Sequence, residues 1–267
     1  MHPHEAAPGG SLVVVIAMLA AVAVYVGPAV ANRRQRPWPA YRSVLWSAGI
    51  ACLGIAAAPG LTGQVTSFVG HTVDHILVGM LAPLLIALSA PVTLALRTLD
   101  PVPARRISRL LGRRAVRFVT HPITALVLYA GGMWALYTTD IFRSMHENTL
   151  LAALVHVHFF FAGYLFTAAV AAVDPTPHRH RHAYRAVVLA AALAAHGILA
   201  KFLFAHPPAG VSGSSAEAGS MLMYYAGDAI DAVLIVVVCG QWFRATRPRA
   251  AATPRRPLIR FPQPSDR

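Results

Sequence analysis

Residues 71–91, HTVDHILVGMLAPLLIALSAP, join a long apolar run to three ionisable side chains at its head, His71, Asp74 and His75. About 20 apolar residues are enough for a helix to span the hydrocarbon core of a bilayer. The stretch therefore predicts a membrane-spanning helix. An ionisable side chain that faces lipid costs about 2.5–3.5 kcal/mol, so these three side chains are expected to have a task inside the protein.

The composition of the whole chain agrees with a membrane protein. Of its 267 residues, 56% are hydrophobic and 12% are charged, with a mean hydropathy of +0.55. The formal net charge of +13 comes mainly from Arg in short runs between apolar stretches, which is typical of an orientation signal and not of nucleic-acid binding. Cys52 and Cys239 lie in separate apolar stretches, so the sequence favours neither a disulfide framework nor a thiolate metal site.

Seven apolar stretches are long enough to cross a membrane, which predicts an all-α, polytopic membrane helical bundle with seven transmembrane helices. The predicted spans are residues 11–31, 43–60, 71–96, 122–140, 149–173, 186–205 and 221–243. Around them the sequence predicts a short outer N-terminal segment over residues 1–10, a seven-helix domain over 11–245 and a disordered basic cytoplasmic tail over 246–267.

Nearly all of the 23 Lys and Arg residues fall in the connections after the first, third and fifth spans and in the C-terminal tail. Arg143 and Lys201 are the exceptions. Positive side chains accumulate on the cytoplasmic side of membrane proteins. The sequence therefore predicts an N-terminus outside and a C-terminus in the cytoplasm.

His71 and His75 stand four residues apart, so that on a helix they share one face, with Asp74 beside them. This spacing can offer two imidazoles to one metal ion. With the predicted orientation, the pair lies in the outer half of the membrane.

Three further spans place ionisable groups at a similar depth. They are His156 and His158 in the fifth span, His196 and Lys201 in the sixth, and Asp228 and Asp231 in the seventh. His156 and His158 point to different sides of one helix, so they are not expected to share a site. Imidazole with carboxylate suits copper or zinc better than magnesium or calcium. The carboxylates could also accept hydrogen bonds from metal-bound imidazoles.

A structural interpretation stays open for each of these residues. A His or Asp in a helical bundle can make an interhelical hydrogen bond, and Lys201 can pair with Asp228 or Asp231. The convergence of four spans at one depth favours a functional site.

Several segments of the sequence resemble the CtaG-like cytochrome c oxidase assembly factors, multi-span membrane proteins of bacteria. The resemblance rests on the His-xxx-His and Ala-Pro pattern of residues 71–91 and on three further segments that occur in the same order along the chain. These are RPWPAYRSVLWSAGIACLGIAAAPG, THPITALVLYAGGMWALYTTDIFRSMHENTLLAALVHVHFFFAGYLF and MLMYYAGDAIDAVLIVVVCGQWF. His71 and His75 match the paired histidines of the family and His156 a fifth-span histidine, whereas Val155 stands where the family often has an acidic residue.

The resemblance implies a factor for the maturation of a copper-containing terminal oxidase. The leading hypothesis is transient copper binding by His71, His75 and His156, with Asp228 and Asp231 as ligands or hydrogen-bond acceptors, followed by delivery. The expected partners are subunits of the terminal cytochrome c oxidase, a soluble copper donor protein and the lipid bilayer of the bacterial plasma (inner) membrane.

Three alternatives remain open from the sequence. A haem-binding membrane oxidoreductase would need His75 or His156 to face His196 across the bundle. A metal permease would need polar groups that continue toward the inner side, and a structural scaffold would need none of them. No pairing of a nucleophile with a base is visible, so the sequence predicts a protein that is not an enzyme.

Overall fold

The structure, a computed structural model, describes residues 8–32, 37–58, 67–175 and 180–247, and within these ranges it contains helices and no strands. The elements, where η marks a π-helical segment, are α1 (Pro8–Ala31), α2 (Ala40–Ala57), α3 (Phe68–Asp74), η1 (His75–Leu81), α4 (Ala82–Leu88), α5 (Pro91–Thr98), α6 (Pro101–Leu111), α7 (Arg114–Val119), α8 (Pro122–Leu126), η2 (Val127–Gly131), α9 (Gly132–Thr138), α10 (Ile141–Glu147), α11 (Thr149–Ala171), α12 (His182–Ala205) and α13 (Gly213–Thr246). The predicted basic tail and most of the predicted N-terminal segment lie outside the described residues.

Six helical segments are long and apolar enough to cross a membrane, and each corresponds to one of the predicted spans. They are Leu12–Ala31, Ala40–Ala57, Phe68–Thr98, Thr149–Ala171, His182–Ala205 and Gly213–Thr246. The remaining predicted span, residues 122–140, forms the continuous run of α8, η2 and α9 from Pro122 to Thr138. At 1.5 Å per residue this run is only about 25 Å long, shorter than the roughly 30 Å of a bilayer core.

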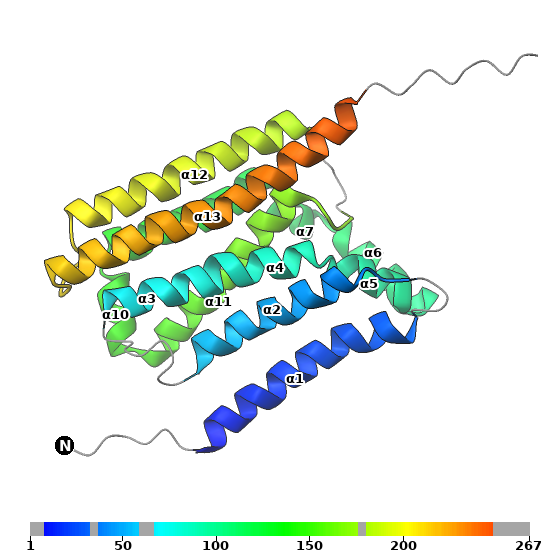
Figure 1. Ribbon diagram of the computed structural model, residues 1–267, viewed down its shortest axis with the longest axis horizontal. Coiled ribbons are helices and arrows are strands. Elements are labelled where there is room, and N and C mark those ends of the chain that lie inside the picture. Colours follow the sequence, from blue (N-terminus) through cyan, green and yellow to red (C-terminus); the bar gives the residue numbers. More distant parts are fainter. Residues whose placement is uncertain (1–7, 33–36, 59–66, 176–179, 248–267) are drawn as a thin grey trace, which may run out of the picture.

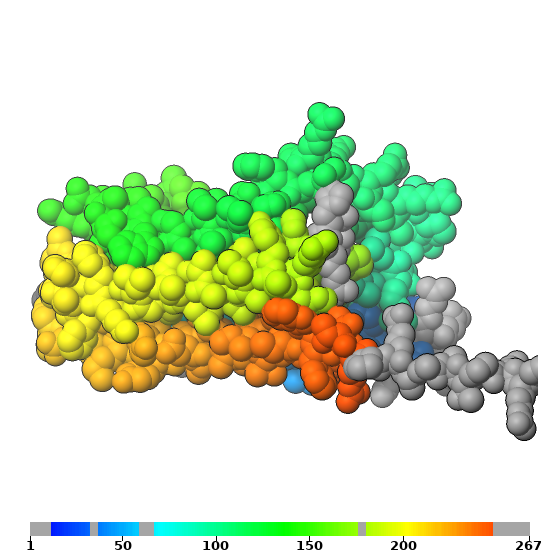
Figure 2. Space-filling model, turned by 90° about the horizontal axis from the view of Figure 1, so that it is seen from above, coloured from blue at the N-terminus to red at the C-terminus, as the bar shows by residue number. Residues whose placement is uncertain are grey.

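The helices lie roughly along one direction, and successive long helices run in opposite senses (Figure 1). The Pro122–Thr138 run joins α7 at one end of the bundle to α10 at the other, so it also traverses the bundle. The Arg-rich helices α6 and α7 lie at the end where α1 and α13 finish (Figure 1). Figure 2 shows α12 and α13 side by side along one face of the molecule.

The first helix is attached to the bundle by aromatic side chains. The ring of Tyr25 stacks on Trp46 with 4.6 Å between centroids, and the Tyr25 hydroxyl donates to the Ser89 carbonyl at 2.6 Å. The indole of Trp38 donates to the same hydroxyl at 3.2 Å. These contacts fix α1 against α2 and α5 although most of its surface is exposed.

The third membrane segment departs from α-helical geometry where a proline follows. Residues His75–Leu81 form a π-helix just before Pro83, which has no N–H to give to the carbonyl of Gly79, its partner in a regular α-helix. That carbonyl faces α11, where a Cβ built on Gly163 would lie 2.1 Å from the Gly79 oxygen. Gly163 therefore permits the close approach of α11 to η1.

The same segment is interrupted at Ala90, which adopts a left-handed conformation with φ 57° before Pro91 begins α5. The carboxylate of Asp174, just after α11, accepts hydrogen bonds from the backbone N–H groups of Val92 and Thr93 at 3.2 and 2.7 Å. It also accepts from the Thr93 hydroxyl at 2.6 Å. Asp174 thus caps the free N–H groups at the start of α5 and holds this break in place.

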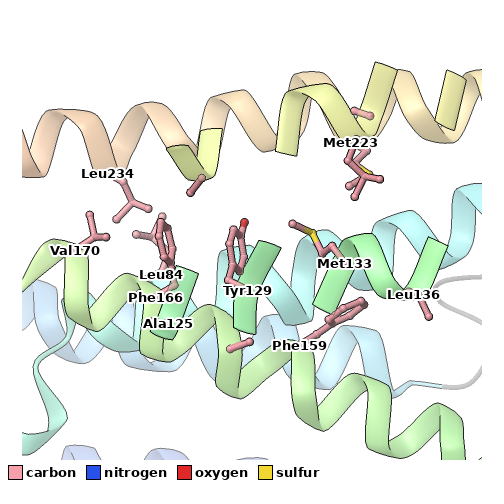
Figure 3. Close-up of a cluster of buried hydrophobic side chains, with 14 of the residues drawn as sticks. Leu84, Ala125, Tyr129, Met133, Leu136, Phe159, Phe166, Val170, Met223 and Leu234 are labelled. Atoms are coloured by element: carbon pink, nitrogen blue, oxygen red, sulfur yellow. The ribbon is translucent and has the colours of Figure 1, made fainter. Parts of the chain in front are cut away.

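The main hydrophobic core lies among α11, α12, α13 and the Pro122–Thr138 run. In Figure 3, Met223 of α13 points toward Met133, and Leu234 of α13 points toward Leu84, Phe166 and Val170, while Phe159 of α11 lies on the other side of Met133. The polar residues discussed below border this core.

Candidate functional site

His71 lies in an aromatic pocket near the end of the bundle opposite the arginines. Its ring is 5% exposed and packs edge-on against Tyr137 of α9 and Phe142 of α10, with ring centroids 5.8 and 5.0 Å away. Neither the Nε2 atom of His71 nor the hydroxyl of Tyr137 has a hydrogen-bond partner within the described part of the chain. Burial without a partner costs about 1–3 kcal/mol for such a group, so this pocket is not optimised for stability alone.

His75 begins the π-helix and turns toward different neighbours from those of His71. Its ring contacts Phe159 of α11 edge-on at 4.9 Å and lies 6.4 Å from the ring of His196 on α12, measured between centroids. His75 and His196 are 2% and 1% exposed. His71 and His75, which the sequence predicts to share one helical face, are thus both buried. Their rings contact different neighbours, however.

His156 lies in the first half of α11, seven residues after Thr149. Its Nδ1 atom is 2.7 Å from the Ala152 carbonyl one turn earlier, so that this nitrogen donates and Nε2 remains the acceptor. His71, His75 and His156 all lie within electrostatic range of one another. Three of the predicted site residues are therefore gathered in one region.

His158 points to the other side of α11, as its spacing from His156 predicts. Its Nε2 atom donates to the Leu128 carbonyl of η2 at 3.2 Å. A Cβ built on Gly132 would lie 2.2 Å from the same nitrogen, so the glycine makes room for the ring. His158 satisfies a backbone carbonyl within a π-helical segment, which is a structural role.

The acidic residues are spread over a wider region. Asp74 is buried beside the two histidines of its helix, and Asp231 is 4% exposed. Asp228 is exposed, yet it lies within electrostatic range of both His196 and Asp231. Lys201 is exposed and places its Nζ atom 5.3 Å from the centroid of the Tyr224 ring.

His146 is a member of this region that the sequence analysis did not single out. It lies on α10, packs edge-on against Phe142 with 4.8 Å between ring centroids, and is within electrostatic range of His71. Its Nδ1 atom is 2.7 Å from the Phe142 carbonyl. The sequence does place His146 in the short connection just before the span that carries His156, and this position could have pointed to it.

The donor set fits a soft or borderline metal ion only in part. Across the described residues, no group of three or more His, Cys, Asp or Glu side chains is arranged to hold a metal ion. Two buried imidazoles with unpartnered nitrogens, His75 and His196, do face each other, and two-coordinate binding needs no third ligand. Imidazole is a ligand that copper and zinc accept.

Comparison with known proteins places these residues in a family. The family model described as "cytochrome c oxidase caa3 assembly factor" matches residues 23–245, which include every site residue discussed above. Two uncharacterized proteins, of Mycobacterium bovis and Mycobacterium tuberculosis, are each 32% identical to the chain over 194 residues, covering 70% of the chain and 29% of each relative. A protein of Mycobacterium leprae is 27% identical over 194 residues. The chain spans about three tenths of the length of these relatives, and no solved structure matches it.

Proposed function

The chain belongs to the cytochrome c oxidase caa3 assembly factor family, and we propose that it supports oxidase assembly by holding copper transiently in the outer half of the membrane. The observation that carries this proposal is the gathering of histidines from α3, η1, α11 and α12 in one region of the bundle, where His71, His75 and His196 are buried and His156 is partly buried. A stable soluble-type core would not retain so many buried imidazoles without hydrogen-bond partners.

In this proposal the histidines have different roles according to their depth in the membrane. His71 and His156 lie nearer the outer end and receive the ion, and His75 lies deeper and holds it. Asp228, within electrostatic range of His196, and Asp231, within range of Asp228, serve as ligands or as hydrogen-bond acceptors for the imidazoles. Weak coordination suits a protein that must release its cargo.

We propose the membrane topology that the arginine distribution predicts, with seven spans, the N-terminus outside and the C-terminus in the cytoplasm. Two features support it. The Pro122–Thr138 run traverses the bundle, and α6 and α7 collect arginines at one end. Local thinning of the bilayer accommodates a span of about 25 Å.

The proposed partners follow from the family. They are subunits of the copper-containing oxidase and a soluble copper donor, which meet the chain at the outer face of the bacterial plasma membrane. The action is holding and transfer of an ion, with no bond made or broken in a substrate, so we propose no enzymatic activity.

The alternative is a haem-binding oxidoreductase, because the spacing of His75 and His196 would also suit two axial ligands of a haem iron. The packing disfavours it, since a Cβ at Gly227 would lie 2.2 Å from the His196 ring and one at Gly79 would lie 3.1 Å from the His75 ring. A haem would require these helices to separate. A Soret band in the purified protein would revive the alternative.

The experiment that tests the proposed function is complementation of a strain that lacks the gene for this chain. The strain receives wild type, the double variant His71→Ala/His75→Ala or the control variant His206→Ala, which changes an exposed histidine on the outer end of α12. We expect wild type and control to restore the oxidase, and the double variant to yield oxidase with several-fold less copper per haem by mass spectrometry. Excess copper in the medium should partly restore the double variant.

Full copper occupancy of the oxidase with the double variant would contradict copper handling by these histidines. It would favour the scaffold alternative. Transport of copper across sealed vesicles by the wild-type chain alone would instead favour a permease.

A further inference from the structure

Two histidines from distant parts of the chain meet inside the bundle. His75 starts η1 and His196 lies in the middle of α12, and their ring centroids are 6.4 Å apart with 30° between the ring planes. The two rings are therefore tilted relative to each other and are too far apart for stacking contact.

Both rings are inaccessible, and none of the four ring nitrogens has a hydrogen-bond partner among the residues that the structure describes. A neutral imidazole carries one N–H donor and one acceptor nitrogen. Buried polar groups in native proteins are nearly always paired, so each unpaired group calls for an explanation such as an absent ion. Here four such atoms occur on two adjacent side chains.

The surrounding backbone is shaped to keep the rings in place. A Cβ at position 227 would lie 2.2 Å from Cε1 of His196, so only glycine on α13 lets this ring occupy its position. The Nδ1 side of His75 lies against Gly79, where an added Cβ would be 3.1 Å away. This leaves Nε2 of His75 as the nitrogen directed away from its own helix. Phe159 closes the edge of the His75 ring.

The spacing matches two imidazoles on opposite sides of one ion. Imidazole nitrogens bind borderline metals at about 2.0 Å, and each nitrogen lies about 1.1 Å from its ring centroid, so collinear binding separates the centroids by about 6 Å. The observed separation is 6.4 Å.

We propose that His75 and His196 form a two-coordinate site for a soft monovalent d10 cation, with Cu(I) as the physiological ion. This proposal rests on the proposed function, from which it takes copper as the cargo, and it specifies the oxidation state and the ligand pair. Two neutral ligands leave the charge of the ion uncompensated. Since the cost of burying an ion rises with the square of its charge, a monovalent ion is favoured over a divalent one. Asp228, within electrostatic range of His196, supplies an opposite charge nearby.

The soft surroundings agree with this choice. Met133 and Met223 are 1% and 0% exposed and belong to the same buried cluster as Phe159 (Figure 3). Phe159 in turn contacts the His75 ring, and apolar and soft side chains of this kind suit Cu(I) better than harder ions. His71, within electrostatic range of His75 and nearer the outer end, offers a step by which the ion reaches the pair.

The test is titration of the detergent-purified full chain with Cu(I) under reducing conditions against a chromophoric Cu(I) chelator, with Ag(I) as a second probe. Wild type is compared with His75→Leu, His196→Leu and the control His206→Leu. We expect one ion per chain in wild type and control, and at least tenfold weaker binding in either of the other two. X-ray absorption of the Cu(I) form should show two nitrogen ligands in a linear arrangement.

Methionine variants separate a ligand role from a structural one. A thioether binds Cu(I) and Ag(I) as a soft ligand but does not replace the shape or hydrogen bonding of imidazole. His75→Met and His196→Met should therefore keep most of the Cu(I) affinity that the leucine variants lose. All variants must elute as folded protein in size-exclusion chromatography.

The outcomes distinguish this inference from the proposed function. Tight Cu(I) binding that survives in both leucine variants would overturn the His75 and His196 site and leave copper handling elsewhere in the chain intact. Absence of Cu(I) and Ag(I) binding by wild type would overturn this inference as well as the copper part of the proposed function. A three- or four-coordinate absorption spectrum would also overturn the two-coordinate site.

Discussion

At the scale of single residues, the histidines of this chain fall into two kinds. His158 donates to the Leu128 carbonyl and so completes the hydrogen bonding of η2. His75 and His196 leave all their ring nitrogens without partners in the described structure, although they are almost completely buried. Histidines of the first kind stabilise the fold. Those of the second kind lower its stability, because their buried nitrogens have no hydrogen-bond partners in the described structure.

We therefore predict that the ion-free protein becomes more stable when this pair is replaced. His75→Leu or His196→Leu removes unpaired polar atoms, each costing about 1–3 kcal/mol, and should raise the apparent midpoint of thermal unfolding in detergent and chelator by about 2–8 °C. His206→Leu, at an exposed position, is the matched control and should change little. A marked fall for His75→Leu would mean that the imidazole organises the bundle.

At the scale of the elements, the position of His75 depends on how closely α11 approaches η1. Pro83 withholds a hydrogen bond from the Gly79 carbonyl, and Gly163 lets that carbonyl face α11 without a collision. The Phe159 ring, one turn before Gly163, then packs against His75. The π-helical segment and the small residue opposite it thus act as one unit.

Gly163→Ala should disrupt this unit. The new Cβ would lie 2.1 Å from the Gly79 oxygen, so the helices must move apart, at a cost of about 1–3 kcal/mol for overpacking. The expected results are a lower apparent unfolding midpoint and weaker Cu(I) binding. Gly240→Ala on α13 is the control, since an added Cβ there has nothing within 4 Å. Equal effects of the two substitutions would contradict the account of the α11 contact.

The sequence predicts the helices better than it predicts the contacts between them. Hydropathy locates the long helices because each must bury about 20 apolar residues in lipid, and the spacing of His71 and His75 places both on the inner side of their helix. Pro83 indicates a break in the third span, but the close approach of α11 to η1 depends on Gly163, which no local pattern reveals. The same holds for His196, whose approach to His75 depends on the glycine at position 227 of another helix, and for His146, which lies outside the predicted spans.

At the scale of the whole molecule, charge and polarity lie at opposite ends. The arginines of α6 and α7 occupy one end, and His71, His146 and His156 lie toward the other. Such a distribution suits a protein that is anchored at the cytoplasmic surface and exchanges an ion with partners at the outer surface.

Single cysteines test this orientation in intact cells. In a background with Cys52→Ser and Cys239→Ser, Glu147→Cys at the α10 end should react with a membrane-impermeant maleimide from outside, because the Glu147 side chain is 70% exposed. Arg109→Cys on α6 should react only after the membrane is permeabilised. The reverse labelling pattern would invert the topology and place the histidines in the inner half of the membrane.

The central claim is that this assembly factor passes copper to the oxidase, and direct transfer tests it best. The purified chain is loaded with one equivalent of Cu(I), mixed with copper-depleted oxidase and separated from it, and the copper in each protein is measured by mass spectrometry. The account predicts that wild type loses its copper to the oxidase, whereas the variant His75→Leu/His196→Leu carries and transfers several-fold less. Retention of the copper by wild type, with none gained by the oxidase, would contradict delivery.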